Sequence, residues 1–140
     1  MGIVDAEKIT VLVAEDNLVN QKVVRRMLMK MGIDVLVVND GLEALKTVQQ
    51  EQVDLILMDI NMPRMNGVEA TREIQKILAE KTPPIYALSA SVTENTLSQS
   101  IQAGMKGFLH KPVKIAELET CLRNVFIVNN ASGTSQDDHM

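Results

Sequence analysis

Short apolar runs rich in β-branched residues alternate with segments of helical periodicity along most of the chain. Such runs are typical of strands, and apolar residues three and four positions apart are typical of amphipathic helices. The predicted strands cover residues 9–14, 35–38, 55–58, 85–88 and 107–110, and the predicted helices cover residues 19–31, 42–50, 68–80, 94–103 and 115–128. Because strands that are apolar throughout are buried on both faces, the pattern predicts an α/β fold with a parallel sheet between helices.

The composition favours one domain and excludes several classes of function. We expect residues 1–7 to be an N-terminal extension, residues 8–128 to form the domain, and residues 129–140 to be a disordered polar tail. A net charge of −4, with only two Phe and one Tyr, argues against direct nucleic-acid binding. The chain shows neither a membrane-spanning stretch nor a secretion signal, and Cys121 is its single cysteine. We therefore expect a cytoplasmic protein without direct membrane contact.

Four of the predicted strands end on polar side chains. Glu15 and Asp16 follow the first strand, Asp59 the third, Ser89 the fourth and Lys111 the fifth. The carboxyl ends of parallel strands share one edge of the sheet, and open α/β sheets place their sites there. If the first and third strands are neighbours, three acids, one hydroxyl and one lysine meet in a single crevice.

Three carboxylates in one crevice need compensating positive charge. Two carboxylates about 5 Å apart repel by roughly 3 kcal/mol at an effective dielectric constant near 20. We predict that Asp16 and Asp59 bind Mg²⁺ (or Mn²⁺) directly, that the backbone carbonyl of Asn61 completes the protein ligands, and that Glu15 acts through water. Lys111 adds a mobile charge that can pair with Asp59 or with phosphate.

Because Mg²⁺ and Lys111 together would nearly neutralise the charge of the three carboxylates, Asp59 is a usable nucleophile in this crevice. A carboxylate can accept a phosphoryl group and form an acyl phosphate, while the metal and Lys111 offset charge in the transition state. A lone serine at a strand end is usually a turn or cap hydroxyl. Ser89 stands in series with four other strand-end groups, so we expect its hydroxyl to donate to the phosphate.

At these positions the chain resembles the receiver domain of two-component response regulators, over roughly residues 8–128. The motifs are Val-Ala-Glu15-Asp16-Asn17, Leu-Met-Asp59-Ile-Asn61-Met62-Pro63, Gly67, Ser89-Ala90 and Phe108-Leu-His-Lys111-Pro112. The resemblance implies a flavodoxin-like (βα)5 doubly wound sandwich, with five parallel strands in the order 2-1-3-4-5 and helices on both faces. It also implies that Asp59 is the phosphoacceptor, Glu15 and Asp16 the acidic pair, Lys111 the lysine, and Ser89 and Phe108 the switch residues, with a cis bond before Pro112.

The implied function is that of a phosphoacceptor in a His-Asp phosphorelay. A histidine kinase or histidine phosphotransfer domain would donate the phosphoryl group to Asp59, and slow autodephosphorylation would remove it. Phosphorylation would switch the surface of the fourth helix, fifth strand and fifth helix, where a downstream protein binds. The first helix, whose apolar stripe is too wide for one buried face, is expected to dock the donor. The fourth helix has Leu97 and Ile101 as its clear apolar pair, so little holds it to the core.

The parent protein is predicted from two local patterns. The Glu15-Asp16-Asn17 start and the segment Asp40–Ala44 resemble receivers attached to hybrid sensor histidine kinases, which could tether the domain to a membrane. The alternative is a stand-alone single-domain response regulator. As a domain, the chain only accepts and loses phosphate, whereas a hybrid parent would be a kinase.

Other classes fit the sequence less well. A pseudo-receiver that serves only as an interaction module usually lacks an acid or the lysine. A haloacid dehalogenase-like phosphohydrolase needs a second Asp where this chain has Asn61. A flavodoxin-like FMN carrier is rejected because Glu15 and Asp16 would repel the cofactor phosphate.

Nearby polar residues are expected to be structural. Asn39 and Asp40 are explained by capping of the next helix. His110 should point away from Lys111 because side chains alternate along a strand. Cys121 is expected to be a small buried side chain.

Overall fold

Strands and helices alternate without exception in the computed structural model, which describes residues 8–127. The predicted extension (1–7) and tail (129–140) lie outside the described residues. The elements are β1 (Thr10–Ala14), α1 (Leu18–Lys30), β2 (Asp34–Val38), α2 (Gly41–Gln50), β3 (Leu55–Asp59), α3 (Gly67–Leu78), β4 (Ile85–Ser89), α4 (Glu94–Ala103), β5 (Gly107–His110) and α5 (Ile115–Leu122). Within residues 8–127, none of the helices combines the length and the hydropathy that a bilayer-spanning helix needs.

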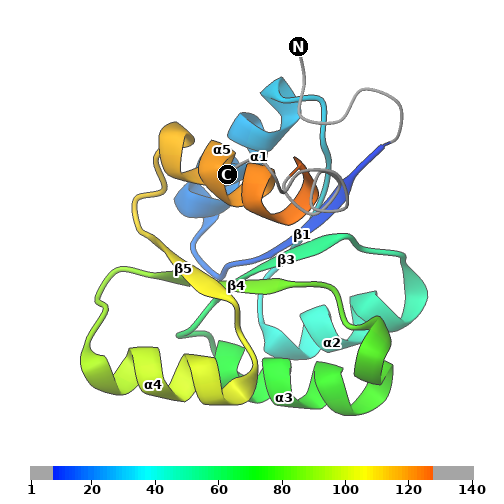
Figure 1. Cartoon of the computed structure of the whole chain (residues 1–140), viewed down its shortest axis with the longest axis vertical. Coiled ribbons are helices and arrows are strands. Elements are labelled where there is room, and N and C mark those ends of the chain that lie inside the picture. The colour runs from blue at the N-terminus through cyan, green and yellow to red at the C-terminus, as the bar shows by residue number, and fades with distance from the viewer. Residues whose placement is uncertain (1–7, 128–140) are drawn as a thin grey trace, which may run out of the picture.

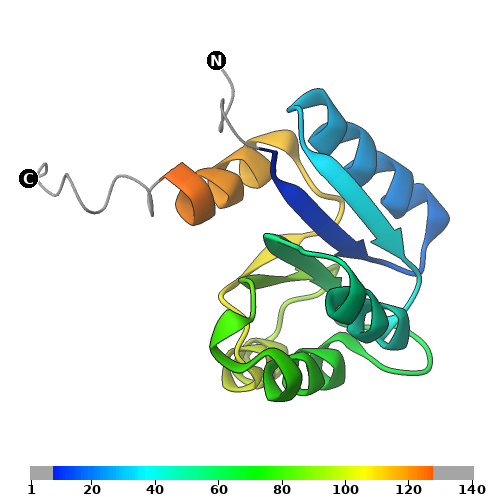
Figure 2. The same ribbon diagram turned by 90° about the vertical axis from the view of Figure 1, so that its right-hand side faces the viewer.

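The five strands form one parallel sheet in the order β2-β1-β3-β4-β5, which confirms the expected order and fold class. Helices α1 and α5 cover one face, and α2, α3 and α4 cover the other (Figure 1). In the turned view, the arrowheads of β1 and β2 point to the same end of the sheet (Figure 2). The strand ends that carry the polar residues therefore share one edge.

Alternate side chains of the central strands fill two cores, one on each face of the sheet. Val11, Val13, Leu55 and Leu57 pack with residues of α1 and α5. Leu12, Ile56 and Met58 pack with residues of α2 and α3. Every residue of β3 is buried. Because each fully buried Leu or Ile contributes about 1.5–3 kcal/mol, the central strands hold the site edge rigidly.

Side-chain caps begin α1, α2, α3 and α4, and the cap of α2 is the one that the sequence predicted. Asp40 accepts a hydrogen bond from the Glu43 backbone N–H at 2.8 Å and starts α2. Asn66 and Glu69 form a reciprocal capping box at the start of α3. Gly32, with φ of 80°, follows the end of α1.

Two predicted helices end earlier than expected. Helix α3 stops at Leu78, where Ala79 takes a positive φ of 52° and a short 3₁₀ turn follows to Lys81. Helix α5 stops at Leu122 and continues as a π-helical turn to Ile127, while residue 128 lies outside the described range.

Helix α4 presents an unexpected face to the core. Leu97 and Ile101, its apolar pair, are 39% and 58% exposed, whereas its buried side chains are Ser100 and Ala103. The Ser100 hydroxyl has no hydrogen-bond partner among residues 8–127. The small apolar contact area of α4 is consistent with weak anchoring.

Candidate functional site

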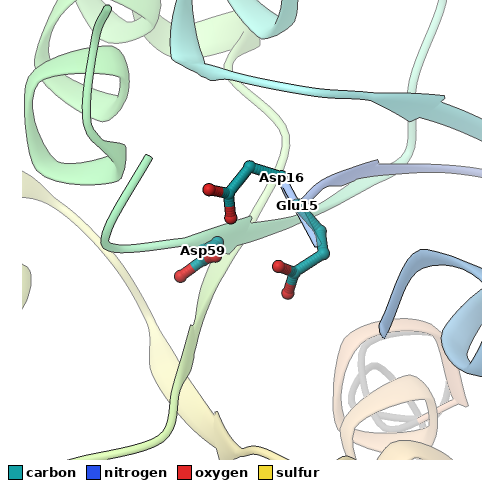
Figure 3. A group of neighbouring side chains, drawn as sticks. All are labelled: Glu15, Asp16 and Asp59. Carbon is teal, nitrogen blue, oxygen red and sulfur yellow. The ribbon is translucent and has the colours of Figure 1, made fainter. Parts of the chain in front are cut away.

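The three acids meet at the edge where β1 and β3 end. These strands are neighbours, with Ala14 opposite Met58, so the residues that follow them are brought together. One carboxylate oxygen from each of Glu15, Asp16 and Asp59 lies within 4.8 Å of the others (Figure 3). Glu15 and Asp59 are buried, and Asp16 is exposed. The predicted convergence of the acids is confirmed, and the cluster has one side open to solvent.

Lys111 enters the same cluster from the end of β5. Its Nζ donates to Glu15 Oε1 at 3.2 Å and to Asp59 Oδ2 at 3.0 Å, and its side chain is 16% exposed. Its backbone N–H donates to the Ser89 carbonyl at 2.9 Å, which ties the end of β5 to the end of β4. The Lys111–Pro112 bond is cis, as the resemblance implied.

The cluster carries more negative than positive charge. Burial is the largest influence on Asp59 and raises the pKa of its carboxyl from 3.8 to about 7, with repulsion from Glu15 acting in the same direction. The hydrogen bond from Lys111 opposes this rise. Burial also acts to lower the pKa of Lys111, but Asp59 and Glu15 outweigh it and raise that pKa above its usual value.

The donor chemistry of the cluster fits a divalent cation. Three carboxylates balanced by one ammonium group leave a formal charge of −2 when all are ionised, and oxygen atoms are the ligands that hard cations prefer. Asp16 is the exposed member of the set, so an ion with its own water ligands can approach from that side.

Ser89, at the end of β4, and Phe108, in β5, make contacts outside the acidic cluster. The Ser89 hydroxyl donates to the Ser91 carbonyl at 2.8 Å and accepts from the Ser91 backbone N–H at 3.2 Å. This is the turn-forming role that a serine at a strand end usually has. Phe108 is half-buried and packs against the core on the α2, α3 and α4 face.

The loop after β3 is closely packed against the phosphoacceptor candidate. The Asn61 backbone N–H donates to Asp59 Oδ1 at 3.1 Å, and the Gly67 N–H donates to the Ile60 carbonyl at 2.9 Å. A Cβ on Gly67 would lie 2.3 Å from the Asp59 carbonyl oxygen, so glycine alone permits this approach. The loop conformation therefore determines where Asn61 stands relative to Asp59.

The explanation of Asn39 and Asp40 as helix caps was incomplete. Asp40 does cap α2, but its Oδ2 also accepts hydrogen bonds from both Nε and Nη2 of Arg64, which lies in the loop after β3. Burial acts to raise the pKa of Asp40, and the hydrogen bonds from Glu43 and Arg64 outweigh it and lower that pKa. Asn39 accepts a hydrogen bond from Gln21 at 2.8 Å. No periodicity signals these contacts, because they join residues that are far apart in the sequence.

The other two structural assignments agree with the structure. His110 is exposed, while Lys111 reaches the acids. Cys121 is buried and has a free thiol, and burial raises its pKa to about 12.

Comparison with known proteins identifies relatives of this chain. The chain is 38% identical over 120 residues to the osmosensing histidine protein kinase SLN1 of Saccharomyces cerevisiae, covering 81% of the chain and 10% of that kinase. The chain thus spans about a tenth of the relative's length.

Two solved structures share the fold. One is the receiver domain of the sensor histidine kinase PA1611 of Pseudomonas aeruginosa, with magnesium coordinated in its active-site cleft. Its TM-score is 0.79 at 38% identity, covering 86% of this chain and 98% of that one. The other is a chain from the S. cerevisiae complex of the histidine phosphotransfer protein Ypd1 with the receiver domain of its response regulator Ssk1. Here the TM-score is 0.80 at 26% identity, covering 87% and 91%.

The sequence profile of the response regulator receiver domain matches residues 11–123, from β1 to the end of α5. This match includes the acids, Ser89, Phe108 and Lys111 in the order expected along the chain. On this evidence, the chain belongs to the response regulator receiver domain family of two-component phosphorelays.

Proposed function

We propose that this domain accepts a phosphoryl group on Asp59 from a phosphohistidine donor and loses it by slow autodephosphorylation. The observation that carries the proposal is the buried Asp59 carboxylate, 3.0 Å from Lys111 Nζ and grouped within 4.8 Å with Glu15 and Asp16. A carboxylate in this position is a nucleophile whose product, an acyl phosphate, has a cationic partner close by.

Mg²⁺, or Mn²⁺ in its place, is the cofactor that the acidic cluster fits. Asp16 and Asp59 would bind the ion directly, Asn61 through its backbone carbonyl and Glu15 through water. When bound, the ion neutralises charge and polarises the phosphoryl oxygens. The magnesium in the cleft of the PA1611 receiver domain supports this assignment.

The transfer step follows from the positions of the charged side chains. A carboxylate oxygen of Asp59 forms the new O–P bond as the P–N bond of the donor breaks, and the donor imidazole keeps the electron pair and takes up a proton. Lys111 Nζ, which donates to Asp59 Oδ2 before the transfer, then also donates to the oxygens of the transferred phosphoryl group. This contact stabilises the charge that develops there.

The switch step would begin at Ser89. Its hydroxyl is engaged with Ser91 in the unphosphorylated domain, so donation to a phosphate on Asp59 requires that this contact break. The β4–α4 loop would then move, Phe108 would turn inward, and the weakly anchored α4 would shift. We expect a downstream protein to bind the α4-β5-α5 surface of either the phosphorylated or the unphosphorylated domain.

The exposed face of α1 is the expected docking site for the donor. Leu18, Val19 and Val23 are 64%, 69% and 39% exposed at the end of α1 that follows Glu15 and Asp16. A histidine kinase or histidine phosphotransfer domain would cover them and bring its phosphohistidine to Asp59. The Ypd1 complex with the Ssk1 receiver domain supports a partner of this kind.

The parent protein is proposed to be a hybrid sensor histidine kinase, with this domain on the cytoplasmic side. The similarity to SLN1 supports this origin, and a stand-alone response regulator is the alternative. In either case the same phosphoacceptor chemistry applies.

Intact mass after incubation with acetyl phosphate and Mg²⁺ tests the proposal. We expect the mass of one phosphoryl group to be gained by the native chain, and not by Asp59→Asn or in the presence of EDTA. Asp54→Asn, at the opposite end of β3, is the matched control and should still be labelled. Labelling of Asp59→Asn would refute the assignment of the phosphoacceptor, and no labelling of the native chain would favour a pseudo-receiver.

A further inference from the structure

Arg64 joins the β3–α3 loop to the start of α2 through ion pairs with Asp40 and Glu43. Arg64 lies in this loop with φ of 65°, and its Nε donates to Asp40 Oδ2 at 2.7 Å. Its Nη2 also contacts Asp40 Oδ2 and lies 3.6 Å from Glu43 Oε2. The same loop carries Asn61, which Arg64 follows by three positions.

The α2 end of this ion pair is fixed in place. Asp40 is 2% exposed, and its Oδ1 is held by the cap hydrogen bond from Glu43. The next residue, Gly41, donates its N–H to the Met65 carbonyl at 3.0 Å, and a Cβ there would lie 2.3 Å from that oxygen. Because the Asp40 carboxylate is buried and caps α2, its position is set by the helix. The ion pair therefore holds Arg64 to α2.

The pair is also connected to the loop that carries the acidic residues. Glu43 Oε1 accepts from the Asn39 backbone N–H at 2.7 Å, and Asn39 Oδ1 accepts from Gln21 Nε2 at 2.8 Å. Gln21 Nε2 also donates to the backbone carbonyl of Glu15 at 2.5 Å. One polar network thus joins the β1–α1, β2–α2 and β3–α3 loops around the acidic cluster.

We propose that Arg64 and Asp40 are positioning residues for the metal site, which order the backbone around Asn61 before the cation binds. The inference rests on the proposed function and identifies two residues outside the expected metal ligands. Ordering a residue's backbone costs conformational entropy, so a loop that must be ordered during binding binds the ion about tenfold more weakly.

Calorimetric titration with Mg²⁺ tests this on the native domain, Arg64→Gln, Asp40→Asn and the double variant. Asn caps helices as well as Asp does, so Asp40→Asn removes the ion pair and keeps the cap. We expect each single variant to bind Mg²⁺ about tenfold more weakly, and the double variant to bind no more weakly than Arg64→Gln, because both changes remove the same Arg64–Asp40 pair. Arg72→Gln, an exposed arginine on α3, is the matched control and should bind like the native domain.

Amide hydrogen exchange without metal supplies a readout that does not depend on phosphorylation. Residues 60–66 should exchange faster in both single variants than in the native domain, while the β1 and β3 amides remain protected. Unchanged Mg²⁺ affinity in the variants, with only a lower urea midpoint, would show a purely structural pair and overturn the inference. If the native domain itself fails to bind Mg²⁺, the proposed function fails instead.

Discussion

At the scale of single residues, Asp59 stands between a like charge and an opposite charge where water barely reaches it. Glu15 raises its pKa and Lys111 lowers it, while burial is the largest influence. With a pKa of about 7, the Asp59 carboxyl is partly protonated near neutral pH. A cation that binds there competes with a proton for the same oxygen atoms.

The raised pKa of Asp59 predicts how the stability of the metal-free domain depends on pH. Between pH about 4 and about 7 the folded carboxyl keeps a proton that the unfolded one has lost, so the free energy of unfolding falls as pH rises through this window. Asp59→Asn removes the charge, and at pH 8 it should be about 1–3 kcal/mol more stable than the native domain. At pH 5 the two should differ less.

Urea denaturation in EDTA at both pH values measures this difference. The raised pKa of Lys111 does not contribute here, because its effect appears only in strongly alkaline solution. A constant difference between the two proteins from pH 5 to pH 8 would contradict the shift.

Lys111 is the only side-chain cation in contact with the acids among residues 8–127. Lys111→Met should destabilise the metal-free domain by about 3 kcal/mol, because two buried carboxylates lose their partner. Mg²⁺ should recover part of this loss. The exposed Lys46→Met is the control and should change stability by less than about 0.5 kcal/mol. Equal urea midpoints for Lys111→Met and the native domain in EDTA would argue against the ion pairs.

At the scale of elements, the junction of β3 and α3 positions both Asp59 and Asn61. Gly67→Ala would place a Cβ 2.3 Å from the Asp59 carbonyl oxygen and 2.9 Å from Met58 Cγ. We expect a loss of about 3 kcal/mol or more, together with weaker Mg²⁺ binding, because strand and helix must separate.

Gly32→Ala is the comparison for this variant. Gly32 has a positive φ of 80°, but apart from its two chain neighbours no residue between 8 and 127 has an atom within 4 Å of the position of its Cβ, so the cost should be about 1 kcal/mol. Thermal unfolding and Mg²⁺ titration of both variants separate the two effects. If Gly32→Ala weakened Mg²⁺ binding as much as Gly67→Ala, the close approach would not be the cause.

At the scale of the whole molecule, the sheet separates two cores and leaves the site at their common edge. One face is closed by α1 and α5 and the other by α2, α3 and α4 (Figure 1). The proposed donor surface on α1 and the proposed output surface at α4-β5-α5 use different elements, although α1 and α5 cover the same face of the sheet. Phosphate at the shared edge could reach both without unfolding either core.

This arrangement predicts that donor docking and phosphate chemistry can be separated. Val19→Glu, at an exposed position of α1, should lower the rate of phosphotransfer from a histidine phosphotransfer protein at least tenfold and leave labelling by acetyl phosphate unchanged. Ile77→Glu, at an exposed apolar position on α3, is the control and should alter neither rate. Parallel loss of both activities in Val19→Glu would indicate damage to the site rather than to docking.

The alternation of strands and helices could be predicted from the amino-acid sequence, and so could the acids, hydroxyl and lysine at the strand ends. Periodicity and capping are local properties, so the strands, the helices and the cap at Asp40 could be predicted. Three features are visible only in the folded chain: Lys111 contacts both Glu15 and Asp59, Arg64 pairs with Asp40, and Ser100 is a buried side chain of α4. These contacts join residues far apart in the chain, and their geometry depends on strand order and loop conformation, which no local pattern records.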